Sequence, residues 1–308
     1  MCLLLRRLEE ARPGLLDSFD ILAGTSAGAA TAAIISVAPT SLEGLDRAIA
    51  FWRGWRPYEG AGPLSPRTLM ALSGRSAFLT HSKLYSDLQD ILGGKRLSEI
   101  SRKLVIPTFS LDNRASLKSR RHWSIQIYHN LSPEIVDSRL NLVDIVLRSS
   151  SVPLLHPVFQ GHVDGGLYAN NPSLNALSLA TDYLDANLRD IMVLSMGQGQ
   201  SNKYMDLADG DVGYGTWLMD PANPTALIKL VMESNLQATN YQCSRILEDR
   251  FIRVDPVLHT DIELVPNQTQ EDYNSQQEAM ASQVDLAFIL DEIDQVPGFL
   301  RETAAPVS

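Results

Sequence analysis

The 308-residue sequence predicts an α/β fold with a largely parallel central sheet flanked by helices on both faces. First, short apolar runs alternate along the chain with longer segments of helical periodicity, which is the pattern of βαβ units. Second, residues 19–37 form a recognisable unit of strand, tight glycine turn and helix. Third, apolar residues make up 44% of the chain and charged residues 20%, which excludes disordered, collagen-like and coiled-coil proteins.

The first quarter of the chain carries clear start and stop signals. Pro13 ends the first helix and Pro39 ends the second, while Thr40 and Glu43 form a capping box at the start of the third. A stretch rich in proline and glycine follows, and such long irregular segments often cover a site. In order, the predicted elements are a helix at 2–11, a strand at 19–23, helices at 27–37 and 40–52, and an irregular excursion at 53–75.

The rest of the chain continues the alternation of strands and helices. Asn171 and Pro172 fit the N-cap and first position of a helix. Strands are predicted at 103–111, 124–128, 157–163, 191–195 and 251–254, and helices at 142–149, 228–247 and 275–293. Because there is no internal repeat and no linker, we expect one domain over residues 1–308, with a core of about 1–200 and the segments of 201–300 packed on it.

The charge is unevenly distributed between the two halves of the chain. Residues 1–150 carry 19 Lys and Arg against 14 Asp and Glu, and residues 151–308 carry 7 against 22, so the halves have net charges of +5 and −15. The densest basic cluster fits either a solvated loop or contact with an anionic membrane surface. It lacks the interleaved aromatic residues of a nucleic-acid groove, so no nucleic-acid partner is expected. The cluster comprises Arg114, Lys118, Arg120 and Arg121.

The sequence predicts a cytoplasmic protein. No apolar run approaches the ~20 residues that span a bilayer, and the apolar residues 1–5 are too few for a signal peptide. The two cysteines, Cys2 and Cys243, give neither a disulfide framework nor a metal-ligand spacing. We therefore expect a reducing compartment and no zinc site.

The sequence Gly-Thr-Ser-Ala-Gly at residues 24–28 is the first candidate for chemistry. It follows a predicted strand and opens a predicted helix, the context in which a G-x-S-x-G serine is held on a sharp turn with its hydroxyl exposed. Gly24 and Gly28 are expected to let the strand and helix approach closely. The alternative is an ordinary tight turn between a strand and a helix, but both flanking elements favour Ser26 as a nucleophile.

A serine hydroxyl needs a base, and histidine fits poorly here. Of the six histidines, only His259 follows both Ser26 and the best carboxylate, and no special turn surrounds it. The early position of Ser26 also argues against an α/β-hydrolase, which places several strands before its nucleophile.

The second candidate is Asp164, at the end of a predicted strand and followed by Gly165 and Gly166. A carboxylate at this place lies where sheet loops build sites. Within hydrogen-bond reach of Ser26, it can take the hydroxyl proton and return a proton to the leaving group. The alternative for Asp-Gly is a plain turn.

These two motifs, in this order, resemble the patatin-like phospholipases, which are lipid acyl hydrolases with a Ser–Asp dyad. The resemblance implies that Ser26 is the nucleophile and Asp164 the base, that Gly24, Gly28, Gly165 and Gly166 support them, and that no metal or cofactor takes part. Further similarity lies at residues 149–153, 170–172 and 193–199, so the resemblance covers about residues 1–200.

One departure from the family concerns the oxyanion hole. In the family, a glycine-rich loop after the first strand supplies its N–H groups, just before a helix that residues 3–10 resemble. Because the sequence begins at the edge of this helix, the strand and the loop are expected to be missing. The backbone N–H of Ala27, at the start of the next helix, is the one donor that the sequence suggests.

Two functions are therefore expected as alternatives. The first is a phospholipase A or lysophospholipase that cleaves carboxylic esters of phospholipids at a membrane surface, as a peripheral protein. The second is a catalytically silent lipid-binding or regulatory protein, because of the missing loop. An apolar lip over the site would serve lipid access, and the alternative for its residues is core packing. The lip residues are Phe51, Trp52, Trp55, Tyr58 and Leu64.

Overall fold

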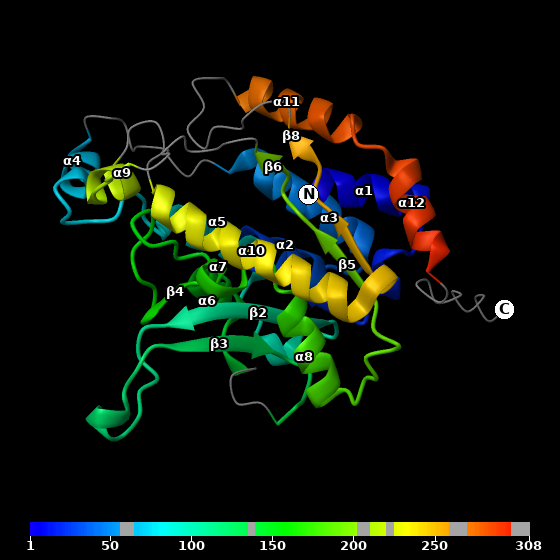
Figure 1. The fold of residues 1–308 in the computed structure, drawn as a ribbon, viewed down its shortest axis with the longest axis horizontal. Coiled ribbons are helices and arrows are strands. Elements are labelled where there is room, and N and C mark those ends of the chain that lie inside the picture. The colour runs from blue at the N-terminus through cyan, green and yellow to red at the C-terminus, as the bar shows by residue number, and fades with distance from the viewer. Residues whose placement is uncertain (56–64, 135–138, 202–209, 220–224, 259–269, 297–308) are drawn as a thin grey trace.

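The computed structural model describes residues 1–55, 65–134, 139–201, 210–219, 225–258 and 270–296. Its centre is a four-stranded sheet built around the long strand β2 (Lys103–Ser110). The other members are β1 (Ile21–Ala23), β3 (Ser124–His129) and β4 (His162–Asp164). Strand β3 pairs along one edge of β2, so β1 and β4 share the other edge (Figure 1).

Strands β1 and β4 approach each other end to end along that shared edge. Strand β1 runs parallel to β2 and pairs its Ala23 with Val105. Strand β4 runs antiparallel to β2 and pairs its Asp164 with Thr108. The carboxyl ends of the two strands therefore converge on the middle of β2, and the loops that follow them are brought together.

The α/β class is confirmed, but the central sheet is mixed where a largely parallel sheet was predicted. Two of its three ladders, β2–β3 and β2–β4, are antiparallel. The segment between β2 and β3 spans only residues 111–123 and contains a single short turn at Lys118–Arg120. Without a crossover helix, β3 returns alongside β2 in the opposite direction.

Two further parallel pairs lie outside the central sheet. Strand β5 (Val193–Met196) pairs with β7 (Phe251–Val254), and β6 (Gln200–Ser201) pairs with β8 (Val257–Leu258). Met196 of β5 and Leu22 of β1 pack against the same small apolar cluster, formed by Leu5, Leu16, Ile35 and Leu45.

Most predicted helices are present within a few residues of their expected bounds. In chain order they are α1 (Cys2–Ala11), α2 (Ala27–Val37), α3 (Ser41–Gly54), α4 (Pro66–Leu72), α5 (Ser82–Leu92), α6 (Leu142–Ser149), α7 (Gly166–Ala169), α8 (Ser173–Tyr183), α9 (Tyr214–Met219), α10 (Ala226–Leu247), α11 (Gln270–Ser282) and α12 (Leu286–Gln295). The single helix predicted at 275–293 is wrong, because Asp285 caps a new helix by accepting from the N–H groups of Ala287 and Phe288.

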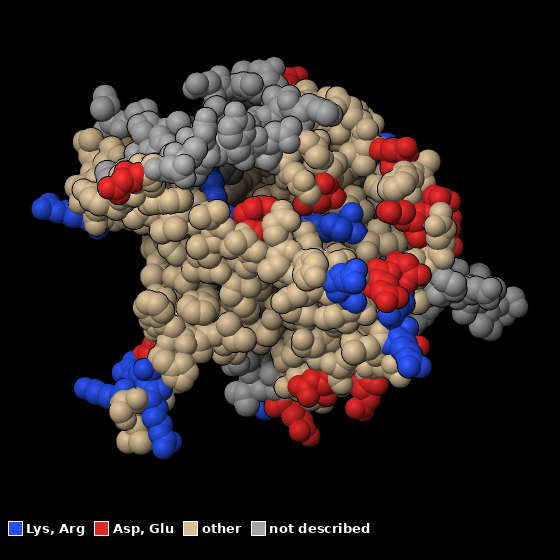
Figure 2. Space-filling model, in the orientation of Figure 1, with Lys and Arg blue, Asp and Glu red and all other residues tan. Residues whose placement is uncertain are grey.

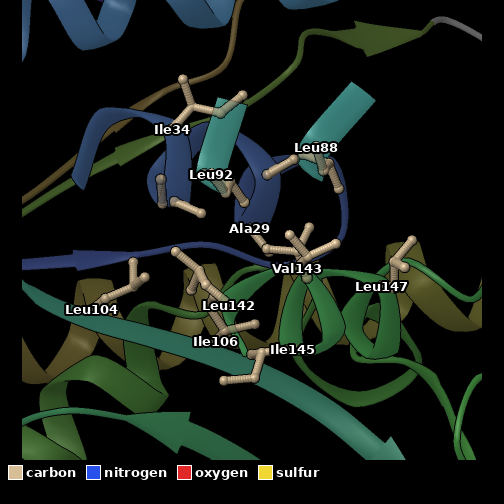
Figure 3. Packing of buried hydrophobic residues seen from close by; sticks show 14 of the residues in the cluster. Ala29, Ile34, Leu88, Leu92, Leu104, Ile106, Leu142, Val143, Ile145 and Leu147 are labelled. Atoms are coloured by element: carbon tan, nitrogen blue, oxygen red, sulfur yellow. The ribbon is translucent and has the colours of Figure 1, made fainter. Parts of the chain in front are cut away.

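The central core lies around helix α2. Its small residues let it pack closely, and Ala29 and Ile34 have no exposed surface. Figure 3 shows these side chains in one cluster with Leu88 and Leu92 of α5, Leu104 and Ile106 of β2, and Val143 of α6. A helix buried to this depth holds the turn before it, which carries Ser26, in a fixed position.

A second core joins the C-terminal elements to the start of the chain. Leu4 and Leu8 of α1 pack with Ile252 of β7 and with Ile289 and Ile293 of α12. Helix α10 crosses in front of α2 (Figure 1). It packs against α7, the short helix that follows Asp164 in the chain. None of the helices within the described ranges combines the length and the apolar character that crossing a bilayer requires.

Candidate active site

Ser26 occupies a strained turn between β1 and α2. Its backbone has φ 54° and ψ −120°, a region that residues with a side chain rarely adopt. Strain of this kind amounts to about 1–3 kcal/mol and persists where the surroundings hold it. The predicted sharp turn is therefore present, and Ser26 is only partly buried, while its neighbours Gly24 and Thr25 are buried.

The two glycines of this turn have different tasks. A Cβ at Gly24 would lie 2.2 Å from the carbonyl oxygen of Gly28, so any side chain at Gly24 would collide with the helix backbone. A Cβ at Gly28 would meet no atom within 4 Å. A side chain at position 28 would therefore not prevent the close approach of the strand end to the helix. The prediction for Gly24 agrees with the structure, and that for Gly28 is wrong because only its backbone makes the contact.

Ser149, at the end of α6, links the serine turn to the aspartate loop. The Ser26 N–H donates to Ser149 Oγ at 3.0 Å, and this hydroxyl donates to the Pro107 carbonyl of β2 at 2.7 Å. The Gly165 N–H donates to the Ser149 carbonyl at 3.3 Å. Ser149 is fully buried, so its three bonds fix the turn and the loop relative to β2.

Asp164 ends β4 and is completely buried. The Gly166 N–H donates to its Oδ1 at 2.7 Å. The loop lies so close to β2 that a Cβ at Gly165 would be 2.1 Å from the Pro107 carbonyl oxygen, and one at Gly166 would be 2.9 Å from Asp164 Oδ1. Gly165 is therefore required by the backbone of β2, whereas a side chain at Gly166 would meet only side-chain atoms, the nearest being Met232 Cε at 2.3 Å.

The environment of Asp164 favours its protonated form. Burial raises the pKa of this carboxyl from 3.8 to about 7, against the opposing effects of the Ser26 hydroxyl and the Gly166 N–H. The Ser26 hydroxyl is a hydrogen-bond partner of this carboxyl, and within the described residues Oδ2 has no partner with standard hydrogen-bond geometry. Such bonds often tighten only when substrate is bound.

The structure thus brings together the two residues that the sequence singled out, which are 138 positions apart. The Ala27 N–H lies beside them in the first turn of α2, where N–H groups have no partner within the helix. The helix dipole adds partial positive charge at this end. The structure therefore places a serine hydroxyl, a buried carboxyl group and the first N–H groups of a helix close to one another.

Asn235 of α10 is a residue of the site that the sequence did not reveal. Its side chain accepts from the Asn170 N–H at 2.9 Å and donates to the Gly166 carbonyl at 2.7 Å. It therefore clamps both ends of α7, the turn that follows Asp164. Nothing in the local sequence of a long helix distinguishes this asparagine from its polar neighbours.

Replacing Asn235 by alanine is expected to lower turnover about tenfold and to destabilise the fold by about 1–3 kcal/mol, because two partly buried backbone groups lose their partner. Steady-state hydrolysis of a soluble ester and urea unfolding measure the two effects. Gln237→Ala is the matched control, since that exposed amide donates to Glu233 on the same helix. Equal behaviour of the two variants would contradict the clamp.

The predicted apolar lip is wrong for three of its five residues. Phe51 is buried in the central core, Trp55 packs against it, and the Trp52 indole N–H donates to Thr31 Oγ1 at 2.9 Å. These aromatic residues line the inner face of α3 and its end, which faces α2. Tyr58 and Leu64 lie outside the described residues.

The histidines near the site do not reach Ser26. His81 and His156 stack with ring centroids 5.5 Å apart, and His81 contacts Ser151, behind the aspartate loop. Burial lowers the pKa of both, that of His156 to about 4. His259 lies outside the described residues. Across the described ranges, no three metal-ligating side chains come together.

Comparison with known proteins gives consistent similarities. The sequence model of a family described as patatin-like phospholipase matches residues 1–177. The chain is 26% identical to the protein CotR of Bacillus subtilis over 295 residues, which cover 85% of this chain and 86% of that protein. It is 27% identical to Patatin-like protein 1 of Arabidopsis thaliana over 287 residues, which cover 80% of this chain and 66% of the plant protein.

Proposed function

The chain belongs to the patatin-like phospholipase family, whose members are lipid acyl hydrolases, and we propose that it cleaves the carboxylic esters of phospholipids through Ser26 and Asp164, as a phospholipase A or lysophospholipase. The observation that carries this proposal is the buried Asp164 carboxyl, with its pKa raised to about 7, beside the hydroxyl of a serine held in a strained turn. Perturbed carboxyls next to nucleophiles are typical of active sites.

In the proposed mechanism, Ser26 Oγ attacks the ester carbonyl carbon while Asp164 takes the hydroxyl proton. Asp164 then gives this proton to the leaving alcohol oxygen as the ester bond breaks, which leaves an acyl group on Ser26. Water attacks the acyl-enzyme, again losing a proton to Asp164. That proton passes to Ser26 Oγ as the fatty acid leaves, and the enzyme returns to its starting state.

The negative charge on the carbonyl oxygen needs stabilisation in both steps. The Ala27 N–H and the N-terminal end of α2 are the groups of the described chain that can provide it. Loss of a single donor in such a hole typically lowers turnover by about 10²–10³. The rate of this protein therefore depends on how many further N–H groups face the same oxygen.

A carboxylate is an effective base here because its pKa is close to neutral. An ordinary aspartate is too weak a base to take a proton from a hydroxyl, whereas burial shifts the pKa of Asp164 to the range in which general bases act.

We further propose that the protein works in the cytoplasm at the surface of a membrane. The unpaired buried thiols Cys2 and Cys243 support a reducing compartment.

The proposal is tested by measuring release of fatty acid from a panel of phospholipids and lysophospholipids, together with hydrolysis of a soluble short-chain ester. We expect turnover by the wild type and none above background by Ser26→Ala or Asp164→Ala. Lipid binding without turnover, equal in wild type and Ser26→Ala, would instead identify the catalytically silent alternative.

The pH dependence of kcat/KM is expected to rise with pH through a midpoint near 7. The base must be ionised, so below the midpoint the rate falls about tenfold per pH unit. His81→Gln and His156→Gln should leave the midpoint unchanged, because burial lowers the pKa of both histidines. A midpoint near 4, or one that disappears in a histidine variant, would contradict Asp164 as the base.

A further inference from the structure

We propose that residues 111–123, which connect β2 to β3 and are called the hairpin tip below, dock the protein on anionic phospholipid membranes. This inference rests on the proposed function, because it supplies the surface from which a lipid substrate would be drawn. The hairpin tip projects from the lower left of the molecule in Figure 1, away from both apolar cores.

Large apolar side chains are exposed on the hairpin tip and at the strand that follows it. Trp123 is 72% exposed, Leu117 57% and Ile125 55%. Trp123 directly precedes β3 and is two positions before Ile125 of that strand, a spacing that favours the same face. Tryptophan is the side chain that best fits the boundary between water and lipid, and the aliphatic residues suit the adjacent acyl region.

The hairpin tip is strongly basic in a protein whose net charge is −10. Residues 111–123 contain four basic residues and one acid, Asp112. Arg121 pairs with Asp112, whereas Arg114, Lys118 and Arg120 are exposed and no described carboxylate pairs with them. Figure 2 shows these basic side chains gathered at the lower left, while acidic side chains gather on the right and at the bottom. This pattern complements an anionic surface.

Hydrogen bonds within the hairpin tip fix its shape. Asn113 donates from Nδ2 to the Arg120 carbonyl at 3.1 Å, and its Oδ1 accepts from the His122 N–H at 3.3 Å. The Asp112 carboxylate accepts from the Arg114 N–H at 2.9 Å. A preformed loop loses little conformational entropy on binding, which favours its use as a docking surface.

The hairpin tip is also joined directly to the candidate active site. The Leu111 N–H donates to the carbonyl of Gly161, three positions before Asp164, at 2.9 Å. Asp164 pairs with Thr108, so about 10 Å of strand β2 separates the level of the carboxylate from the start of the hairpin tip. Docking by this tip would place β4 next to the lipid surface.

A second group of exposed apolar residues lies on the same side of the molecule in Figure 1. Leu69, Met70 and Leu72 of α4 are each at least 50% exposed. Helix α4 occupies the upper left and the hairpin tip the lower left (Figure 1), and the surface between them is largely uncharged in Figure 2. A flat membrane can contact both regions at once.

The composition of the hairpin tip favours a membrane over a nucleic acid. A nucleic acid would need several stacking aromatic residues, whereas residues 111–123 contain only Trp123 and His122 with aromatic rings.

Sedimentation with vesicles tests the proposal, using phosphatidylcholine alone and phosphatidylcholine with about 30% phosphatidylserine. Each basic residue near an anionic surface contributes about 1 kcal/mol, which is about fivefold in affinity. The triple variant Arg114→Gln, Lys118→Gln, Arg120→Gln should therefore bind the anionic vesicles about 100-fold more weakly. Leu117→Ser with Trp123→Ser should weaken binding to both kinds of vesicle.

Matched controls remove the same charge or a similar exposed side chain elsewhere. The triple variant Lys95→Gln, Arg189→Gln, Arg245→Gln changes three exposed basic residues, and Tyr241→Ser removes an aromatic ring that is 69% exposed on α10. Both controls should bind vesicles as the wild type does. All variants should hydrolyse a soluble ester at the wild-type rate.

The outcomes separate the docking surface from the proposed function. Vesicle binding that depends on the hairpin tip, in a protein that hydrolyses no ester, would support the docking surface and overturn the function. Ester hydrolysis with vesicle binding that the tip variants leave unchanged would overturn the docking surface alone. Tighter binding to an RNA oligonucleotide than to anionic vesicles, lost in the basic triple variant, would also overturn it.

Discussion

Replacing Ser26 by glycine is expected to abolish ester hydrolysis and to raise the free energy of unfolding by about 1 kcal/mol. The loss of hydrolysis, at least about 10³-fold, follows from removal of the nucleophilic oxygen. The gain in stability follows from the backbone, because φ 54° with ψ −120° is strained for serine and easily adopted by glycine. The bond from the residue 26 N–H to Ser149 is kept, since it uses only the backbone.

Ser26→Ala is the matched control for this prediction. It removes the same oxygen but keeps a Cβ, so it should be as inactive as Ser26→Gly without the gain in stability. Urea unfolding of both variants, with hydrolysis of a soluble ester, measures the two effects. A glycine variant less stable than the alanine variant would show that the turn is not strained, and residual turnover in either would contradict the role of Ser26.

Replacing Asp164 by asparagine is expected to lower hydrolysis by at least about 10³-fold while making the protein more stable at pH 8. Asparagine cannot act as a base, yet its carbonyl oxygen can still accept from the Gly166 N–H. The stability gain arises because the folded protein holds an ionised carboxylate that is fully buried. A pKa raised from 3.8 to about 7 corresponds to about 4 kcal/mol as an upper estimate.

The raised pKa of Asp164 determines how the stability gain of Asp164→Asn depends on pH. Between pH 3.8 and about 7 the folded state holds a proton on Asp164 that the unfolded state has lost, so the wild type loses stability as pH rises through this range. The advantage of Asp164→Asn should therefore be absent below about pH 4, grow as pH rises, and level off above about pH 7. Unfolding at several pH values measures it.

Asp182→Asn is the control for a change of carboxylate to amide, since Asp182 is exposed on α8. It should leave both turnover and the free energy of unfolding at pH 8 as in the wild type. An Asp164→Asn protein that is less stable than the wild type at pH 8 would mean that the carboxylate is held by favourable contacts rather than penalised by burial.

The sequence predicted Ser26 and Asp164 because their signals are local. Ser26 follows a short apolar strand and lies between Gly24 and Gly28, whereas Asp164 ends a short strand and is followed by two glycines. Both residues precede a helix, and Gly24 and Gly165 are required by close backbone contacts at these turns. What brings the two turns together was not predicted. We expected parallel strands, whereas the antiparallel direction of β4 lets its end meet that of β1 along β2.

The sequence did not predict the roles of the supporting residues, because these roles depend on tertiary contacts. Ser149 is 123 positions from Ser26, and Asn235 is 69 positions from Gly166, so no local pattern links either pair. The prediction for the aromatic residues Phe51 and Trp52 was wrong for the same reason. Their aromatic character is typical of a lipid interface, but they project from the side of α3 that faces the core.

The proposed mechanism depends on activation of the Ser26 nucleophile by Asp164. Its most direct test is the rate of labelling by a fluorophosphonate, with the modified peptide identified by mass spectrometry. We predict one adduct, on Ser26, that is absent in Ser26→Ala and forms at least about 100-fold more slowly in Asp164→Asn. An adduct on another serine, or labelling of Ser26 at the wild-type rate in Asp164→Asn, would contradict this mechanism.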